Sequence, residues 1–326
     1  MKKIVYFVCM IFIFIPVMVF SQKYINDDRT IKVAVVKNPY TGHRRGPELS
    51  QGPEIIEKGG LKEVLLKSGC NIKDIVSVQL SPEESKEYGV WHRLGLADGH
   101  LGKIVSSFEK RNIFTIGLLG NCNSLMGMLA GLQHSGERNR PLKVGLVWID
   151  AHGDFNTPET TLSGMLGGMP VAVSAGLCLT RLRYKAGLEP ALPTKYIVMA
   201  GVRDVDPLEQ ELIDRSDIEM ISVDDIKKLS NNIDFQMKRL CKLTDKVYVH
   251  IDMDVLDPPE IPGSNFLVPG GPTSTELAGA LTEIFKYKKV SALGIASFPA
   301  GKNDNKIAVK AALNLIKGAI EGIKKR

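Results

Sequence analysis

The sequence predicts an α/β fold built on a mostly parallel β-sheet, and three observations lead to this prediction. Short apolar, β-branched runs alternate along the chain with longer runs of helical periodicity, which is the pattern of repeated βαβ units. One short run, Ile113–Leu119, is apolar throughout, as expected for a strand that is buried on both faces of a sheet. Two others, which end at Ile149 and Ile251, run directly into Asp clusters that would meet at the carboxyl edge of a parallel sheet.

The first half of the chain starts with a strand and then alternates. Ile31–Val36 is apolar and β-branched and is the first predicted strand. A polar loop over 37–46 leads to the amphipathic run Ile55–Leu66, a predicted helix that stops at Gly69. The elements predicted next are a strand at Val76–Leu80, a helix at Leu101–Phe108, the strand Ile113–Leu119 and, after a break at 120–124, a helix at Leu125–Leu132.

The second half continues the alternation. Val144–Ile149 is the predicted strand that leads into the first Asp cluster, and 163–176, rich in Gly, Met and Ala, is expected to pack closely on the sheet. Pro207 suits the first turn of a helix that follows the strand at Tyr196–Ala200. The remaining predictions are strands at Val247–Ile251 and Val290–Ile295 and a terminal helix at Lys306–Ile323.

The N-terminus has the layout of a secretory signal peptide. Two lysines precede the apolar run Ile4–Phe20, and Val19 and Ser21 suit the −3 and −1 positions of a cleavage site. We expect cleavage near Ser21, which leaves 22–326 as a single exported domain, either periplasmic or extracellular. The alternative is an uncleaved anchor that would attach the protein to a membrane through this segment alone. The run is, however, at the short end for a membrane span, and Pro16 interrupts it.

Composition gives no indication of nucleic-acid binding. The 326 residues carry a formal net charge of +6, and loss of residues 1–21, with two lysines and no acid, leaves +4. We interpret the basic C-terminal end, 323–326, as a solvated helix end. Four cysteines remain after cleavage and are too few for a disulfide-built fold, so we interpret them as mostly buried thiols: Cys70, Cys122, Cys178 and Cys241.

The first Asp cluster belongs to the stretch VWIDAHGDFNTP at 147–158. Asp150, His152 and Asp154 occupy alternate positions, so in an extended chain they project to one side. Two carboxylates and an imidazole on one side suit a divalent ion such as Mn²⁺ or Zn²⁺.

The second stretch, VYVHIDMDVLDP at 247–258, repeats this arrangement with Asp252 and Asp254. One Asp-rich strand end is often only a helix cap or a turn. Two such ends, each after an apolar strand, indicate a site for two metal ions at one edge of the sheet.

These two stretches resemble the signatures of the ureohydrolase family, which includes arginases, agmatinases and formiminoglutamases. Residues 150–154 and 250–258 carry the resemblance, which extends from about Lys32 to the C-terminus. It implies a three-layer α/β/α sandwich with an eight-stranded parallel sheet, as in arginases and the related deacetylases. It also implies hydrolysis of a guanidino, amidino or amide C–N bond by metal-bound hydroxide, because two divalent ions lower the pKa of a bridging water to about 7. Mn²⁺ and a homo-oligomer are the cofactor and assembly that the resemblance implies.

The resemblance also assigns metal ligands. Asp150 and Asp252 match the carboxylates that bridge both ions, and His152 and Asp254 match ligands of one ion. Asp154 matches a ligand of the other ion and a partner of the bridging water.

A second set of residues matches the family's substrate contacts. Asn156, Thr161 and Ser163 match the loop that holds the carboxylate of an amino-acid substrate. Asp206 and Glu209 match the pair that meets its α-amino group. The alternative is an ordinary loop and a solvated helix face.

One metal ligand departs from the family pattern. Gly120-Asn121-Cys122 stands where the family has Gly-Asp-His, so Cys122 takes the place of a ligand, or Asn123 does if the match shifts by one residue. A thiolate ligand favours Zn²⁺ or Fe²⁺ over Mn²⁺. Alternatively, Cys122 is an inert thiol beside a single-metal site.

The groups that act on the substrate depart further. Gly167 replaces the family's proton-shuttling histidine, and Met165 replaces a substrate-contacting Asn. Asn265-Phe266 stands where the family has Gly-Thr before a Pro. Ser297 replaces the glutamate that clamps the guanidinium, and a buried guanidinium without a carboxylate partner is costly.

Three interpretations therefore remain open. The first is a metal-dependent hydrolase with one or two ions per chain, whose substrate is a small molecule such as an amino-acid derivative other than arginine. The second is a non-catalytic binding or scaffold protein with a degenerate metal site, which Gly167 and Ser297 favour. The third is a single-metal amide hydrolase.

Overall fold

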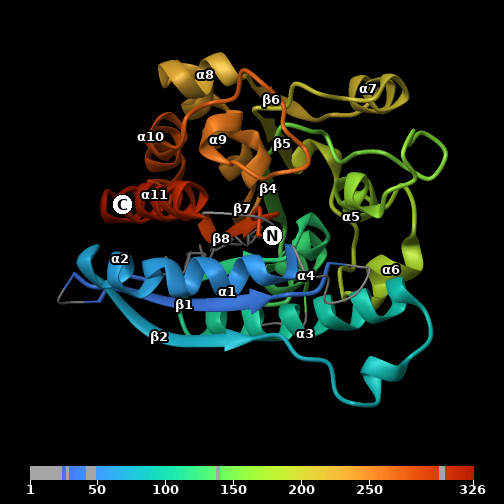
Figure 1. Ribbon diagram of the computed structural model, residues 1–326, viewed down its shortest axis with the longest axis horizontal. Coiled ribbons are helices and arrows are strands. Elements are labelled where there is room, and N and C mark those ends of the chain that lie inside the picture. The colour runs from blue at the N-terminus through green and yellow to red at the C-terminus, as the bar shows by residue number, and fades with distance from the viewer. Residues whose placement is uncertain (1–23, 27–28, 42–48, 137–139, 301–304) are drawn as a thin grey trace, which may run out of the picture.

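The computed structural model of the chain describes residues 24–26, 29–41, 49–136, 140–300 and 305–326. The predicted signal segment, 1–21, lies outside these residues. The described residues form an eight-stranded sheet in which every pair of neighbouring strands is parallel, with helices on both faces (Figure 1). The predicted three-layer α/β/α architecture is therefore confirmed.

The strands follow the order β2-β1-β3-β8-β7-β4-β5-β6 across the sheet. Their bounds are β1 Ile31–Asn38, β2 Cys70–Ser77, β3 Phe114–Leu119, β4 Val144–Ile149, β5 Ile197–Ala200, β6 Glu219–Ile221, β7 Lys246–Asp252 and β8 Val290–Ala296.

The helices form the two outer layers. Their bounds are α1 Gly52–Ile56, α2 Lys62–Lys67, α3 Val90–Lys110, α4 Leu125–Gln133, α5 Pro170–Ser174, α6 Thr180–Lys185, α7 Pro207–Asp214, α8 Val223–Lys228, α9 Asn231–Leu243, α10 Ser274–Phe285 and α11 Lys306–Lys324. A π-helical stretch, η2 Glu57–Leu61, joins α1 to α2. Short 3-10 turns are η1 Leu49–Gln51, η3 Glu84–Lys86, η4 Cys122–Ser124, η5 Leu166–Gly168, η6 Thr194–Tyr196, η7 Met253–Val255 and η8 Pro258–Glu260.

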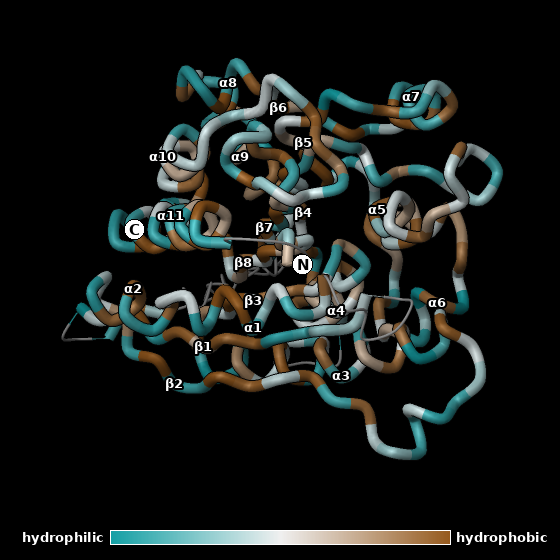
Figure 2. Tube along the Cα trace, viewed as in Figure 1, coloured by the Kyte–Doolittle hydropathy of each residue, from teal (hydrophilic) through white to brown (hydrophobic). Residues whose placement is uncertain are grey.

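The four central strands β3, β8, β7 and β4 are buried along their whole length. Apolar residues dominate these strands, and the polar residues concentrate on the outer helices (Figure 2). Because helices cover both faces, a central strand needs apolar side chains on both sides, which explains why runs such as 113–119 were recognisable in the sequence. The carboxyl ends of these adjacent strands meet at one edge of the sheet.

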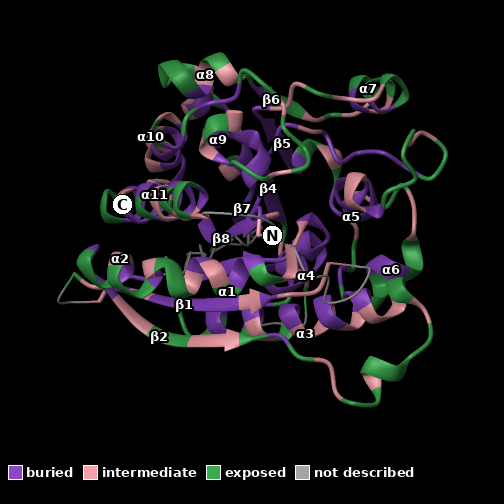
Figure 3. Cartoon of the chain, in the orientation of Figure 1, coloured by how far each residue is buried: buried purple, intermediate pink, exposed green. Residues whose placement is uncertain are grey.

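The edge strands differ from the predictions. The strand predicted at Val76–Leu80 was wrong in its bounds, because β2 spans Cys70–Ser77 and several of its residues are half-exposed or exposed (Figure 3). At the other edge, β6 has only three residues and was not predicted. An edge strand has one neighbour and one exposed flank, so its sequence mixes polar and apolar residues.

Two further properties bear on the predictions about export and cysteines. Among the described residues, no helix combines the length and the apolarity that a membrane span requires. Four thiols in this part of the chain are free of disulfides, and Cys70 and Cys122 are buried whereas Cys178 and Cys241 are half-buried.

Candidate metal and substrate site

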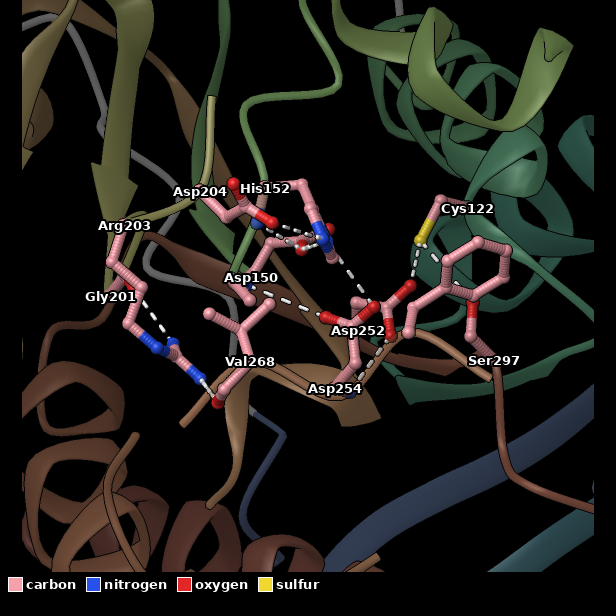
Figure 4. Close-up of polar contacts among 12 residues, drawn as sticks. Cys122, Asp150, His152, Gly201, Arg203, Asp204, Asp252, Asp254, Val268 and Ser297 are labelled. Atoms are coloured by element: carbon pink, nitrogen blue, oxygen red, sulfur yellow. Dashed lines mark hydrogen bonds and ion pairs between the residues drawn. The ribbon is translucent and has the colours of Figure 1, made fainter. Parts of the chain in front are cut away.

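The ends of the four central strands bring the predicted ligands together (Figure 4). β4 leads into Asp150 and His152, and β7 ends at Asp252, with Asp254 in the η7 turn that follows. Two further residues complete the edge: Cys122 begins η4 after β3, and Ser297 follows β8.

Asp150, His152 and Asp254 form the first potential ligand group. One ligand atom from each of them lies within 4.8 Å of the others. The His152 Nδ1 atom is 3.4 Å from Asp150 Oδ1 and 3.3 Å from Asp254 Oδ2. A β-bridge between His152 and Asp204 holds the loop after β4 beside the loop after β5. Two segments about a hundred residues apart thus converge on a volume that one cation would fill.

Cys122, Asp150 and Asp252 form a second potential ligand group, again with one ligand atom from each within 4.8 Å. The Cys122 Sγ atom lies 2.7 Å from Asp252 Oδ2. Cys122 lines the site cavity, whereas Asn123, the alternative that a one-residue shift would place there, does not. Because Asp150 belongs to both groups, the two volumes adjoin each other.

Asp154 lines the same cavity but belongs to neither group. It is buried and has a positive φ of 47°, which an Asp residue tolerates better than most. The left-handed backbone at this position ends the extended stretch after β4. Asp154 therefore faces the cavity beside the two groups, not on a continuation of the strand.

The electrostatics of the site favour a bound cation. Burial, followed by the charges of neighbouring carboxylates, raises the pKa of Asp150 and Asp154, and raises the pKa of Asp252 to about 7. Burial opposes the charged form of His152, but hydrogen bonds to Asp150 and Asp254 outweigh it and raise its pKa to about 12. Asp150 Oδ2 is buried without a hydrogen-bond partner among the described residues. Carboxylate and imidazole donors with an unpaired buried oxygen fit divalent ions.

The cavity above these groups has a volume of about 360 Å³. Its lining includes several acidic residues and also the apolar side chains of Leu162, Met165 and Phe266. The Phe266 ring stands edge-on to His152, with 6.4 Å between the ring centres. No Lys or Arg is among the described residues that line it, and Arg203 instead donates to the carbonyls of Gly201 and Val268. A larger cavity of about 680 Å³ runs along α3 and contains none of the ligand groups.

The predicted substrate residues are only partly available for binding. The Asn156 Nδ2 group donates to Asp206 Oδ2 at 3.0 Å and to Glu209 Oε2 at 3.1 Å. Glu209 also accepts from the Phe155 N–H and forms a capping box with Asp206 at the start of α7. The buried side chain of Asn156 therefore connects the loop after β4 to the start of α7.

The other predicted contacts are more exposed. Thr161 is half-buried and Ser163 is exposed, with 3.4 Å between their Oγ atoms, and Ser163 lines the cavity. At Gly167, also on the cavity, an added Cβ would meet nothing within 4 Å. The space for a catalytic side chain is thus present although the side chain is missing.

Asn156→Ala is expected to destabilise the protein by about 1–3 kcal/mol, because it leaves the buried Glu209 carboxylate without one of its donors. Urea unfolding measures this change. Glu159→Ala, at an exposed position of the same loop, is the control and should change the stability by less than about 0.5 kcal/mol. Equal effects of the two substitutions would mean that the hydrogen bonds of Asn156 to α7 do not stabilise the protein.

Two residues of the site were not predicted from the sequence. Asp204 Oδ2 lies 3.7 Å from His152 Nε2, and His250 lies with its Nε2 atom 3.3 Å from Cys122 Sγ. A signal for His250 was present, since it is an imidazole inside an otherwise apolar strand. Asp204 stands two residues before Asp206 and had no comparable signal.

Comparison with known proteins identifies the family that this chain resembles. Residues 31–320 match the Arginase family. The chain is 32% identical to an arginase of Brevibacillus brevis over 234 residues, which covers 70% of this chain and 76% of the relative. It is 30% identical to the mitochondrial arginase-2 of Homo sapiens over 278 residues, covering 81% of this chain and 76% of the relative. The solved structure of the Bacillus caldovelox arginase superimposes with a TM-score of 0.76 at 26% identity and covers 89% of this chain and 98% of that one.

Proposed function

Because this chain belongs to the arginase family, we propose that it is a metal-dependent hydrolase that acts on a C–N bond of a small molecule other than arginine. The observation that carries the proposal is the pair of ligand groups that share Asp150 at the carboxyl edge of the sheet. Loss of the family's guanidinium clamp at Ser297 directs the proposal away from arginine.

Divalent ions, when bound, would activate a water molecule and stabilise the negative charge that develops on the substrate. Asp150, His152, Asp252 and Asp254 would hold them, and Cys122 would complete the second group. Asp154, buried beside the cavity with a raised pKa, is the group that can hold a proton and return it to the leaving nitrogen, since Gly167 cannot.

The lining of the cavity favours a substrate with a cationic amine and an uncharged reacting end. Asp204, Asp206 and Glu209 lie on the cavity in addition to the carboxylates of the two ligand groups, and they would attract an amine. The lining also includes the hydroxyl of Ser297 and the apolar side chains of Met165 and Phe266. An amide or a neutral amidine that is attached to an amine matches this lining better than a guanidinium does.

The test combines metal analysis with an activity panel. Protein loaded with Mn²⁺, Zn²⁺ or Fe²⁺ is expected to retain one or two ions per chain after gel filtration. It should release ammonia or urea from a neutral amide or amidine faster than it releases urea from arginine. Retained metal without turnover on any compound would favour the non-catalytic interpretation, which the missing side chain at Gly167 supports. Absence of bound metal after loading would refute the proposal.

Ser297→Glu is expected to increase kcat/KM for arginine at least about tenfold, because it supplies a carboxylate partner for the guanidinium, and a charged hydrogen bond contributes about 1.5–3 kcal/mol. Residue 297 has a positive φ of 55°, but serine already bears the backbone cost of this conformation, so the substitution adds little to it. Ser297→Gln has the same backbone cost without the charge and is the matched control. Adding Gly167→His should raise kcat further. Equal activity of the Glu and Gln variants would contradict the clamp.

We also propose that the protein is exported, on the basis of the apolar run Ile4–Phe20 and the small residue at Ser21. N-terminal sequencing of protein isolated from its native cells should find a chain that begins near Gln22. A chain that still carries its first residues and sediments with membranes would instead indicate an uncleaved anchor.

A further inference from the structure

A continuous line of polar contacts runs through the core behind the second ligand group. The Tyr248 hydroxyl lies 2.9 Å from His250 Nδ1, and His250 Nε2 lies 3.3 Å from Cys122 Sγ. Cys122 Sγ in turn lies 2.7 Å from Asp252 Oδ2. Tyr248, His250 and Asp252 occupy alternate positions on β7 and therefore share one face of the strand.

The His250 ring is fixed by its surroundings. It is fully buried and stacks on Trp148 of the neighbouring strand β4, with 4.5 Å between ring centres and 11° between ring planes. The Tyr248 hydroxyl sits over Gly294 of β8, where an added Cβ would be 2.0 Å from the oxygen. Glycine at this position makes room for the hydroxyl that meets His250. The orientation of the imidazole thus depends on three adjacent strands.

These contacts select one tautomer of His250. The ring is fully buried, and its two nitrogens face a hydroxyl and a sulfur atom and not a carboxylate, so it is a neutral imidazole with a hydrogen on only one nitrogen. His250 Nδ1 is the acceptor in hydrogen-bonding reach of the Tyr248 hydroxyl among the described residues, so the hydroxyl donates to Nδ1. The remaining hydrogen is then on Nε2, which faces Cys122 Sγ.

We propose that His250 is a positioning residue whose Nε2–H donates to the Cys122 thiolate, and that this contact makes the Cys122–Asp150–Asp252 group selective for a thiophilic divalent ion such as Zn²⁺ or Fe²⁺. The inference rests on the proposed function, because it assigns a metal class to one of the two groups of that site. Thiolate ligands select softer metals than carboxylates do. The thiol proton leaves to solvent when the ion binds.

A hydrogen bond from His250 to the Cys122 sulfur would stabilise the thiolate form of this ligand. Cys122 as a thiolate would add a third negative charge beside Asp150 and Asp252 in a buried site. A donor aimed at the sulfur offsets part of that repulsion and orients the ligand. Replacing such a partner of a metal ligand typically costs about 10–100-fold in affinity.

Cobalt(II) titration tests the inference, since a cobalt–thiolate bond gives a near-ultraviolet charge-transfer band that carboxylate and imidazole ligands lack. The wild-type chain is expected to show this band, and Cys122→Ser should lose it. His250→Leu should weaken the binding that produces the band by about 10–100-fold and move the band to lower energy. His250→Gln keeps an N–H near the position of Nε2 and should restore both.

Tyr248→Phe is the milder variant, and it keeps the inference testable if His250→Leu does not fold. It leaves the imidazole in place and removes only the hydroxyl that fixes the tautomer, so its band should shift in the same direction by a smaller amount. An unshifted band and unchanged affinity in both His250→Leu and Tyr248→Phe would overturn the role of His250.

The outcomes separate this inference from the proposed function. One cobalt per chain without a charge-transfer band would mean that Cys122 is not a ligand, which refutes the inference while the Asp150–His152–Asp254 group still holds its ion. In a competition experiment, Zn²⁺ should displace Mn²⁺ more readily from the wild type than from Cys122→Asp. Equal displacement from the two proteins would likewise refute the selectivity. A chain that binds no cobalt at all would refute the proposed function itself.

Discussion

Asp150→Asn is expected to change the stability in opposite directions with and without divalent ions. In the presence of a chelator at about pH 8, the substitution removes one of several buried carboxylates that repel each other, so the free energy of unfolding should rise by about 1–3 kcal/mol. With free ion at about 1,000 times its dissociation constant, the wild type gains about 4 kcal/mol from binding. The variant should lose most of that gain, because both ligand groups share Asp150. Thermal unfolding with EDTA and with Mn²⁺ measures both effects.

Asp224→Asn is the matched control. Asp224 is exposed on α8 and pairs with Lys228 four residues later. Its substitution should change the stability by less than about 0.5 kcal/mol under both conditions. If Mn²⁺ stabilised the Asp150→Asn variant as strongly as the wild type, Asp150 would not be the shared ligand of the two groups.

Strands that are buried on both faces were predicted correctly from the sequence, and the partly exposed edge strands were not. The central strands were found in the sequence because burial on both faces requires continuous apolar runs, as in β3 and β4. The predicted strand at Val76–Leu80 overlaps only the end of β2, because exposed residues such as Lys73 and Asp74 interrupt the apolar pattern earlier in that strand. At the opposite edge, β6 is too short for any periodicity to show. Local pattern thus indicated the interior of the sheet and not its borders.

The candidate site was predictable where ligands follow a strand closely. Asp150 and His152 come within three residues of the end of β4, so the strand fixes their direction. His250 was not assigned because its role depends on Trp148 of the neighbouring strand and on Tyr248, and no spacing along the sequence reports that a ring stacks across two strands. Asn156 was expected to meet a substrate, and its bonds to α7 emerged only with the fold. The roles of these residues could not be predicted because they depend on contacts between segments that are distant in the sequence.

The same carboxylates predict an unusual dependence of stability on pH. Asp150, Asp154 and Asp252 have higher pKa values in the folded protein than in the unfolded chain, so the folded state binds more protons between the two values. The stability of the chelated protein should therefore fall as the pH rises from about 5 to about 8. For Asp252 alone, a rise of the pKa from 3.8 to about 7 corresponds to a total loss of about 4 kcal/mol, at about 1.4 kcal/mol for each pKa unit, of which about 3 kcal/mol falls between about pH 5 and about pH 8.

His152 does not reverse this trend. Its pKa is raised to about 12, so the stability that it contributes is fully present below its ordinary value of 6.5 and is lost as the pH rises towards 12. Its effect thus has the same sign as that of the carboxylates and begins at a higher pH. Cys122, whose pKa is raised by burial and by Asp252, stays protonated in the chelated protein through this range.

Bound ions should reverse the slope, because they require deprotonated carboxylates and displace the protons that otherwise stabilise the folded state. Urea unfolding at about pH 5, 6.5 and 8, with EDTA and with Mn²⁺, measures both slopes. Asp252→Asn removes one titrating group, and its chelated form should show a shallower fall than the wild type. A chelated wild type that became more stable as the pH rose would mean that the carboxylates do not repel one another in the folded protein. The electrostatics of this edge of the sheet would then not favour a bound cation.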